Sequence, residues 1–130
     1  MKNIFILLGT LTISFQLNAQ EWQTPAIEGY GQIQYYEEVA QLPDTSLTYK
    51  MIFNIENEKE KEGVNVGLWK IARTLNLLKA GNVVHKKIDI VGVIHGEATY
   101  AILSHEEYKK RFKTQNPNME LLKLLKENGV

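Results

Sequence analysis

The residues best suited to chemistry lie together at His95-Gly96-Glu97. They directly follow the apolar run "IDIVGVI", Ile88–Ile94. A run that is apolar almost throughout, with weak alternation, is typical of a parallel strand covered on both faces. In open parallel sheets, ligands bind outside the carboxyl ends of the strands. We therefore take His95, Gly96 and Glu97 as the candidate ligand-binding residues.

His95 has two interpretations that the sequence leaves open. Its imidazole could donate a hydrogen bond, act as a general base or bind a metal. Gly96 would let a ligand approach, and the helix start that follows would favour an anion. Alternatively, His95 only hydrogen-bonds backbone or a partner subunit, and Glu97 is a solvated acid at a favourable helix start.

Motifs for known chemistries are missing from the sequence. No second histidine or carboxylate stands at metal-ligand spacing from His95. There is also no Ser-His-Asp order, phosphate-binding glycine loop or dinucleotide fingerprint. The sequence therefore predicts no catalytic residue, no metal site and no cofactor.

A βαβ unit is needed to position these residues. Thr48–Ile55 alternates apolar with mixed residues and predicts a strand. Val66–Ala80 has apolar residues at helical spacing, with Asn65 as N-cap and Gly81 as the stop, and predicts a helix. The charged stretch Glu56–Gly63 between them is typical of a solvated loop. The predicted buried stripe of the helix is Leu68, Ile71, Ala72, Leu75 and Leu78.

Two further helices are predicted after the candidate site. Ser104 and Glu107 form a capping box that opens a helix over His105–Lys113. Asn118 would cap the last helix, Met119–Asn128. A third parallel strand would follow in a βα alternation. The sequence ends instead, so we expect either a naturally short product or a fragment.

The sequence divides into an amino-terminal export segment and the remainder of the chain. Residues 1–19 combine Lys2, an apolar stretch and Ala19 in the layout of a secretory signal peptide. The alternative is an uncleaved amino-terminal anchor. Residues 20–47 look irregular, and residues 48–130 form the predicted α/β domain. We expect a periplasmic or secreted protein, with no stable membrane insertion once the signal is cleaved.

Composition excludes several classes of function. The 130 residues include 15 basic and 15 acidic side chains, so no basic excess favours nucleic acid. The sequence has no cysteine, and therefore no disulfide, no thiolate nucleophile and no cysteine metal site.

The order of these segments resembles a known family. The stretches "YKMIFNI", "ARTLNLLKAG", "IDIVGVIHGEAT" and "YKKRF…NPNMELLKLLKENGV" are similar to the exported branch of the DsrE/DsrF-like proteins. The resemblance implies a three-layer α/β sandwich with a mostly parallel sheet, here without its carboxyl-terminal strand or strands. It also implies a homo-oligomer, a trimer or hexamer. Many relatives carry a cysteine on a further strand and relay sulfur as a persulfide.

Three functions follow as expectations. The first is a non-catalytic, exported, oligomeric binding or assembly protein. The second is a sulfur-relay persulfide carrier that works only in a longer, cysteine-containing form, because thiolate chemistry needs a thiol. The third is a fragment without independent function. The open strand edge predicted at the end of the sheet favours association.

Overall fold

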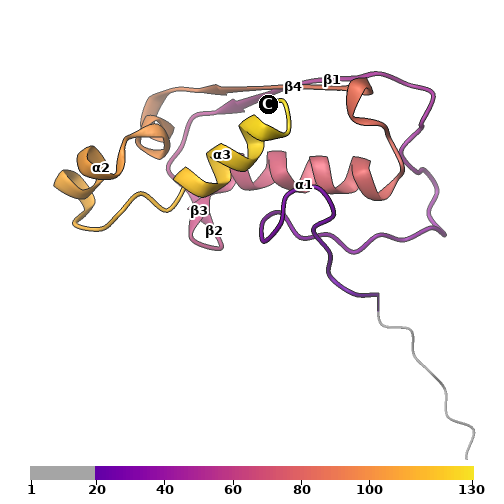
Figure 1. Ribbon diagram of the computed structural model, residues 1–130, viewed down its shortest axis with the longest axis horizontal. Helices are drawn as coiled ribbons and strands as arrows, with labels where there is room; N and C mark the ends of the chain where they lie inside the picture. The colour runs from indigo at the N-terminus through magenta and orange to yellow at the C-terminus, as the bar shows by residue number, and fades with distance from the viewer. Residues whose placement is uncertain (1–19) are drawn as a thin grey trace, which may run out of the picture.

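The computed structural model describes residues 20–130, and the predicted signal peptide, residues 1–19, lies outside the described residues. The structure shows an α/β fold (Figure 1). Strands β1, Tyr49–Ile55, and β4, Ile88–Ile94, pair in parallel, with Tyr49 opposite Ile88 and Ile55 opposite Ile94. Helix α1, Val66–Ala80, lies in the connection between them.

Helix α1 has the bounds that the sequence predicted. The Asn65 side chain accepts a hydrogen bond from the Gly67 N–H at 2.8 Å, and the Gly81 N–H donates to the Leu77 carbonyl at 3.0 Å. Both caps satisfy backbone groups that a helix end leaves without partners. The predicted stripe, Leu68, Ile71, Ala72, Leu75 and Leu78, is entirely buried.

The two strands cover α1 with one face only. Alternation along β1 is confirmed, since every second side chain points toward the core. On the opposite face Ile52 is 77% exposed, Val91 50% and Val93 45%, and Figure 1 shows α1 and α3 on the other side. The prediction that both faces of Ile88–Ile94 are covered is therefore wrong for residues 20–130. The sequence does not distinguish these cases, because an apolar run looks the same whether its outer valines are exposed or buried in a core.

The charged stretch after β1 contains a hairpin that the sequence reading missed. Strand β2, Glu60–Lys61, pairs antiparallel with β3, Val64–Asn65. Between them Glu62 and Gly63 both have positive φ, 53° and 80°. A two-residue turn with positive φ at both positions matches the right-handed twist of the strands it joins. The loop prediction is thus corrected to a short hairpin.

Trp69 of α1 packs against this hairpin. Its indole N–H donates to the Glu62 carboxylate at 2.9 Å, and the Lys61 ammonium lies 5.0 Å from the ring centroid. Trp69 is 5% exposed, whereas Trp22 in the amino-terminal segment is 62% exposed. The two tryptophans therefore occupy contrasting environments.

Residues 20–47 pack on α1 largely without secondary structure. Their one β-bridge joins Gln23 and Ile33. Much of the segment lies on the side of α1 away from the strands (Figure 1). Gly31 comes so near the helix that a Cβ there would lie 2.2 Å from the backbone nitrogen of Arg73. Only glycine allows this approach.

Asn76 holds this segment from inside the protein. Its Oδ1 accepts from the Ala26 and Ile27 N–H groups, both at 2.8 Å. Its Nδ2 donates to the carbonyls of Tyr30 at 2.8 Å and Gly31 at 2.9 Å. Asn76 has no exposed surface. One side chain thus satisfies four backbone groups that no regular element pairs.

The remaining elements are helical. They are η1, His85–Lys87; η2, Gly96–Ile102; α2, His105–Phe112; and α3, Met119–Glu127. Half of the predicted capping box of α2 is confirmed, since Ser104 Oγ accepts from the Glu107 N–H at 3.2 Å. The Glu107 carboxylate pairs with Lys110 instead of bonding the Ser104 N–H. None of the helices formed by residues 20–130 is long and apolar enough to cross a membrane.

We expect Asn76→Ala to lower the free energy of unfolding by at least about 2 kcal/mol, because buried backbone groups lose their partners. Chemical denaturation measures the change. Asn54→Ala, the same substitution at an exposed strand position, should cost less than about 1 kcal/mol. Equal effects of the two substitutions would contradict the anchoring role of Asn76.

Candidate functional site

The structure separates the three predicted site residues. His95 is exposed on the outer face of the strands, where its Nε2 lies 2.7 Å from Asn54 Oδ1. Gly96 turns the chain with φ of 59°, and a Cβ there would lie 3.0 Å from the Glu56 carbonyl oxygen. Glu97 lies on the other side of this turn and lines a pocket. His95 and Gly96 do not line that pocket.

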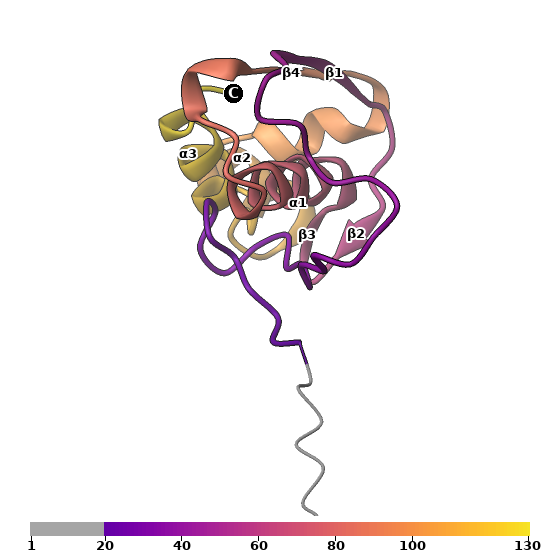
Figure 2. The ribbon, with the colours of Figure 1, turned by 90° about the vertical axis from the view of Figure 1, so that its right-hand side faces the viewer.

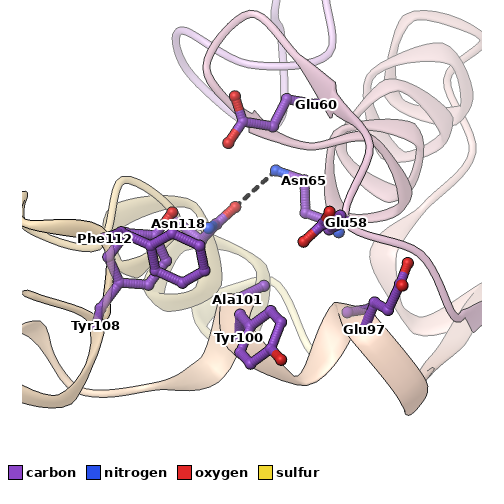
Figure 3. A pocket seen from close by; sticks show the side chains of 10 residues that line it. Glu58, Glu60, Asn65, Glu97, Tyr100, Ala101, Tyr108, Phe112 and Asn118 are labelled. Atoms are coloured by element: carbon purple, nitrogen blue, oxygen red, sulfur yellow. Dashed lines mark hydrogen bonds between the residues drawn. The ribbon is translucent and has the colours of Figure 1, made fainter. Parts of the chain in front are cut away.

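The pocket has a volume of about 320 Å³, and Figure 3 shows the side chains that line it. Two of them, Glu58 and Glu97, follow the carboxyl ends of β1 and β4. This is the position that the sequence predicted for a site. The hairpin, η2, α2 and the start of α3 enclose it. Its lining residues are Glu58, Glu60, Asn65, Glu97, Ala98, Tyr100, Ala101, Tyr108, Phe112 and Asn118.

Aromatic rings form one wall of the pocket. Tyr108 and Phe112 stand one turn apart on α2, with ring centroids 4.4 Å apart. Tyr100 of η2 meets Phe112 edge-on at 5.5 Å. The Arg111 guanidinium already lies 4.0 Å from the Tyr100 ring centroid. Such ring faces attract cations through their quadrupole.

Three carboxylates form the other side, as Figure 3 shows. Glu58, Glu60 and Glu97 are exposed, and no lysine, arginine or histidine is among the lining residues. The negative charges of these carboxylates also act on the aromatic wall. Burial raises the pKa of the Tyr108 phenol above its ordinary value, and the negative charges of Glu60 and Glu58 raise it further. The charged residues that line the pocket are therefore all acidic.

A chain of buried asparagines supports the pocket from below. Asn118 Oδ1 accepts from the Asn65 N–H at 2.6 Å instead of capping α3. Asn116 Oδ1 accepts from the N–H and the Nδ2 of Asn118 at 2.9 and 3.0 Å. Asn116 Nδ2 donates to the carbonyls of Ala101 and Leu103 at 2.9 and 2.6 Å. These amides already have partners, so they shape the pocket and leave ligand binding to the rings and carboxylates.

The arrangement suits a small organic cation. Aromatic faces and carboxylates are the two groups that bind ammonium and guanidinium ions in proteins. Within residues 20–130, no three His, Cys, Asp or Glu side chains come together in a group that could hold a metal ion. The lining residues also include no nucleophile paired with a base.

Sequence reasoning missed most of this pocket. The signal for Glu58 and Glu60 was available, because they follow β1 as Glu97 follows β4, and parallel strands end at one edge. Tyr108 and Phe112 stand four residues apart, which places them on one face of a helix. Nothing in the sequence showed that η2 and α2 would fold over this edge.

No protein-family model, curated protein or solved structure matches this chain.

His95→Ala should change the free energy of unfolding by no more than about 1 kcal/mol, because its single hydrogen bond to Asn54 is exposed. A double-mutant cycle with Asn54→Ala isolates that bond. Thermal or chemical denaturation gives all of the required values. A loss above about 2 kcal/mol for His95→Ala alone would show a structural role that this geometry lacks.

The free energy of unfolding should fall above about pH 10, in part because of Tyr108. Below that pH both states hold the neutral phenol. Above it the unfolded chain ionises first, since the pKa of Tyr108 is raised in the fold. Tyr108→Phe should therefore lessen the alkaline loss, and Tyr36→Phe, at an exposed position, should not. Identical pH profiles for the two variants would contradict the raised pKa.

Proposed function

We propose that this chain is a non-catalytic binding protein whose pocket at the carboxyl ends of β1 and β4 takes a small organic cation. The observation that carries the proposal is the pairing of three aromatic rings with three carboxylates around one cavity. A primary or quaternary ammonium group would lie against Tyr108 and Phe112. The carboxylates of Glu58 and Glu60 would balance its charge.

Size and charge support this ligand class. A volume of about 320 Å³ is at the lower end of the range for small-molecule pockets. An anion would meet the three carboxylates without any basic partner among the lining residues. A neutral apolar molecule would gain nothing from them. A cation is the ligand whose affinity both walls increase.

The resemblance to the DsrE/DsrF-like proteins supports the wider proposal of an exported, oligomeric protein. In such an oligomer a neighbouring subunit would cover the exposed face at Ile52, Val91 and Val93 and supply the third layer of the sandwich. We favour binding over sulfur relay because a persulfide carrier needs a thiol, and this sequence has no cysteine.

Titration with butylammonium, followed by NMR of the aromatic side chains, tests the proposal. We expect saturable shifts at Tyr100, Tyr108 and Phe112. Glu60→Gln should weaken binding about two- to fivefold, the range for one exposed charge. Glu28→Gln removes the same charge from an exposed position in the amino-terminal segment and serves as the matched control.

Butanol provides the second control, because it keeps the alkyl chain without the charge. If butanol shifts the same resonances with equal affinity, the pocket binds the alkyl chain and not the charge, and the proposal fails. It also fails if Glu60→Gln and Glu28→Gln leave the affinity equally unchanged.

A further inference from the structure

The buried residues that line the cation pocket offer a ligand mainly carbon. They are Asn65, Ala98, Ala101, Tyr108 and Asn118. The amide oxygens of Asn65 and Asn118 already accept hydrogen bonds from backbone N–H groups of the protein. The rest of this buried lining consists of two alanine methyl groups and one tyrosine with a single hydroxyl. A ligand group that donates several hydrogen bonds therefore finds few acceptors here.

The carboxylates of the pocket lie in water. Glu58, Glu60 and Glu97 are all exposed, and an exposed carboxylate gains little from a direct ion pair. Burial, and then the charges of Glu60 and Glu58, raise the pKa of the Tyr108 phenol, so these charges act across the pocket. The carboxylates can thus attract a cation that remains against the rings.

Arg111 shows that the aromatic wall already holds one cation. Its guanidinium carbon lies 4.0 Å from the ring centroid of Tyr100 and 5.8 Å from that of Phe112. Among residues 20–130, Arg111 forms no ion pair with a carboxylate. A guanidinium is more weakly hydrated than a compact ammonium, so it loses less water on a ring face. The wall therefore suits cations that bind water weakly.

On the basis of the proposed function, we infer that the cation in this pocket is a quaternary ammonium ion and not a primary ammonium. A primary ammonium has three N–H donors, which would lose water and find a single hydroxyl among the buried lining groups. A trimethylammonium group has no donor to satisfy. Its methyl groups can pack on Ala98 and Ala101, and its charge can lie over the faces of Tyr108 and Phe112.

The charge of the lining also excludes an anionic group beside the trimethylammonium. Every charged residue that lines the pocket is acidic. A phosphate attached to the same ligand would meet these carboxylates without a basic partner. The ligand is thus a free quaternary ammonium ion, such as choline, and not the phosphocholine head group of a lipid.

Three related ligands test the preference on the unaltered protein. Choline carries the trimethylammonium, ethanolamine carries a primary ammonium on the same hydroxyethyl chain, and a dimethylbutanol has carbon in place of the choline nitrogen. Titration followed by NMR of the aromatic side chains gives the three affinities. Choline should bind on the order of fivefold more tightly than ethanolamine. It should also bind more tightly than the neutral carbon analogue.

The outcomes separate this inference from the proposed function. If ethanolamine binds as tightly as choline and the carbon analogue binds more weakly, the preference for a quaternary ion is overturned and the cation site stands. If choline and its carbon analogue bind equally, or if neither binds, both are overturned. Phosphocholine that binds as tightly as choline would overturn the choice of a free ion over a lipid head group.

A change in the aromatic wall gives an independent check. Phe112→Leu keeps an apolar side chain and removes one ring face, so choline should bind about two- to fivefold more weakly and ethanolamine should lose less. Phe112 is 37% exposed, and thermal unfolding verifies that the variant is folded. Tyr36→Leu removes an exposed ring from the amino-terminal segment and is the matched control. Equal choline affinity in the two variants would overturn the inference.

Discussion

Hydrogen bonds from buried asparagine amides hold together the parts of this protein that regular structure leaves apart. A buried backbone group without a partner costs free energy comparable to a lost hydrogen bond. Residues 20–47 have almost no backbone pairing of their own, yet Ile27 is completely buried. Asn76 makes that burial tolerable by supplying two acceptor and two donor contacts from inside α1. The packing of residues 20–47 on α1 therefore depends on the side-chain amide of Asn76.

The same chemistry fixes the pocket. Asn118 links the start of α3 to β3, and Asn116 links the loop before α3 to η2. These segments are distant in sequence, and few apolar contacts could specify their spacing so narrowly. A fully satisfied polar network sets geometry more strictly than apolar packing does. The rings and carboxylates that line the cavity are thus placed by amides whose hydrogen bonds are made within the protein.

Local patterns were sufficient to predict the βαβ unit. The spacing of Leu68 to Leu78 and the caps at Asn65 and Gly81 set α1, and the apolar run Ile88–Ile94 set β4. Position relative to strand ends predicted where a pocket would form. The outer face of β4 was not predictable, because exposed and covered valines look alike in a sequence. Side chains alternate between the two faces of a strand, so a shift of one position moves a side chain from the cavity side to the solvent side. His95 falls on the solvent side.

The contact between Trp69 and the β2–β3 hairpin gives the protein an internal optical reporter. Trp69 donates a hydrogen bond to Glu62 in the turn and lies against the ammonium of Lys61 in β2. Trp22 is surrounded mostly by water. Their emission spectra should therefore separate, with the shorter wavelengths coming from Trp69. A phenylalanine in place of Trp22 would leave a single fluorophore whose emission reports the surroundings of Trp69 at the β2–β3 hairpin.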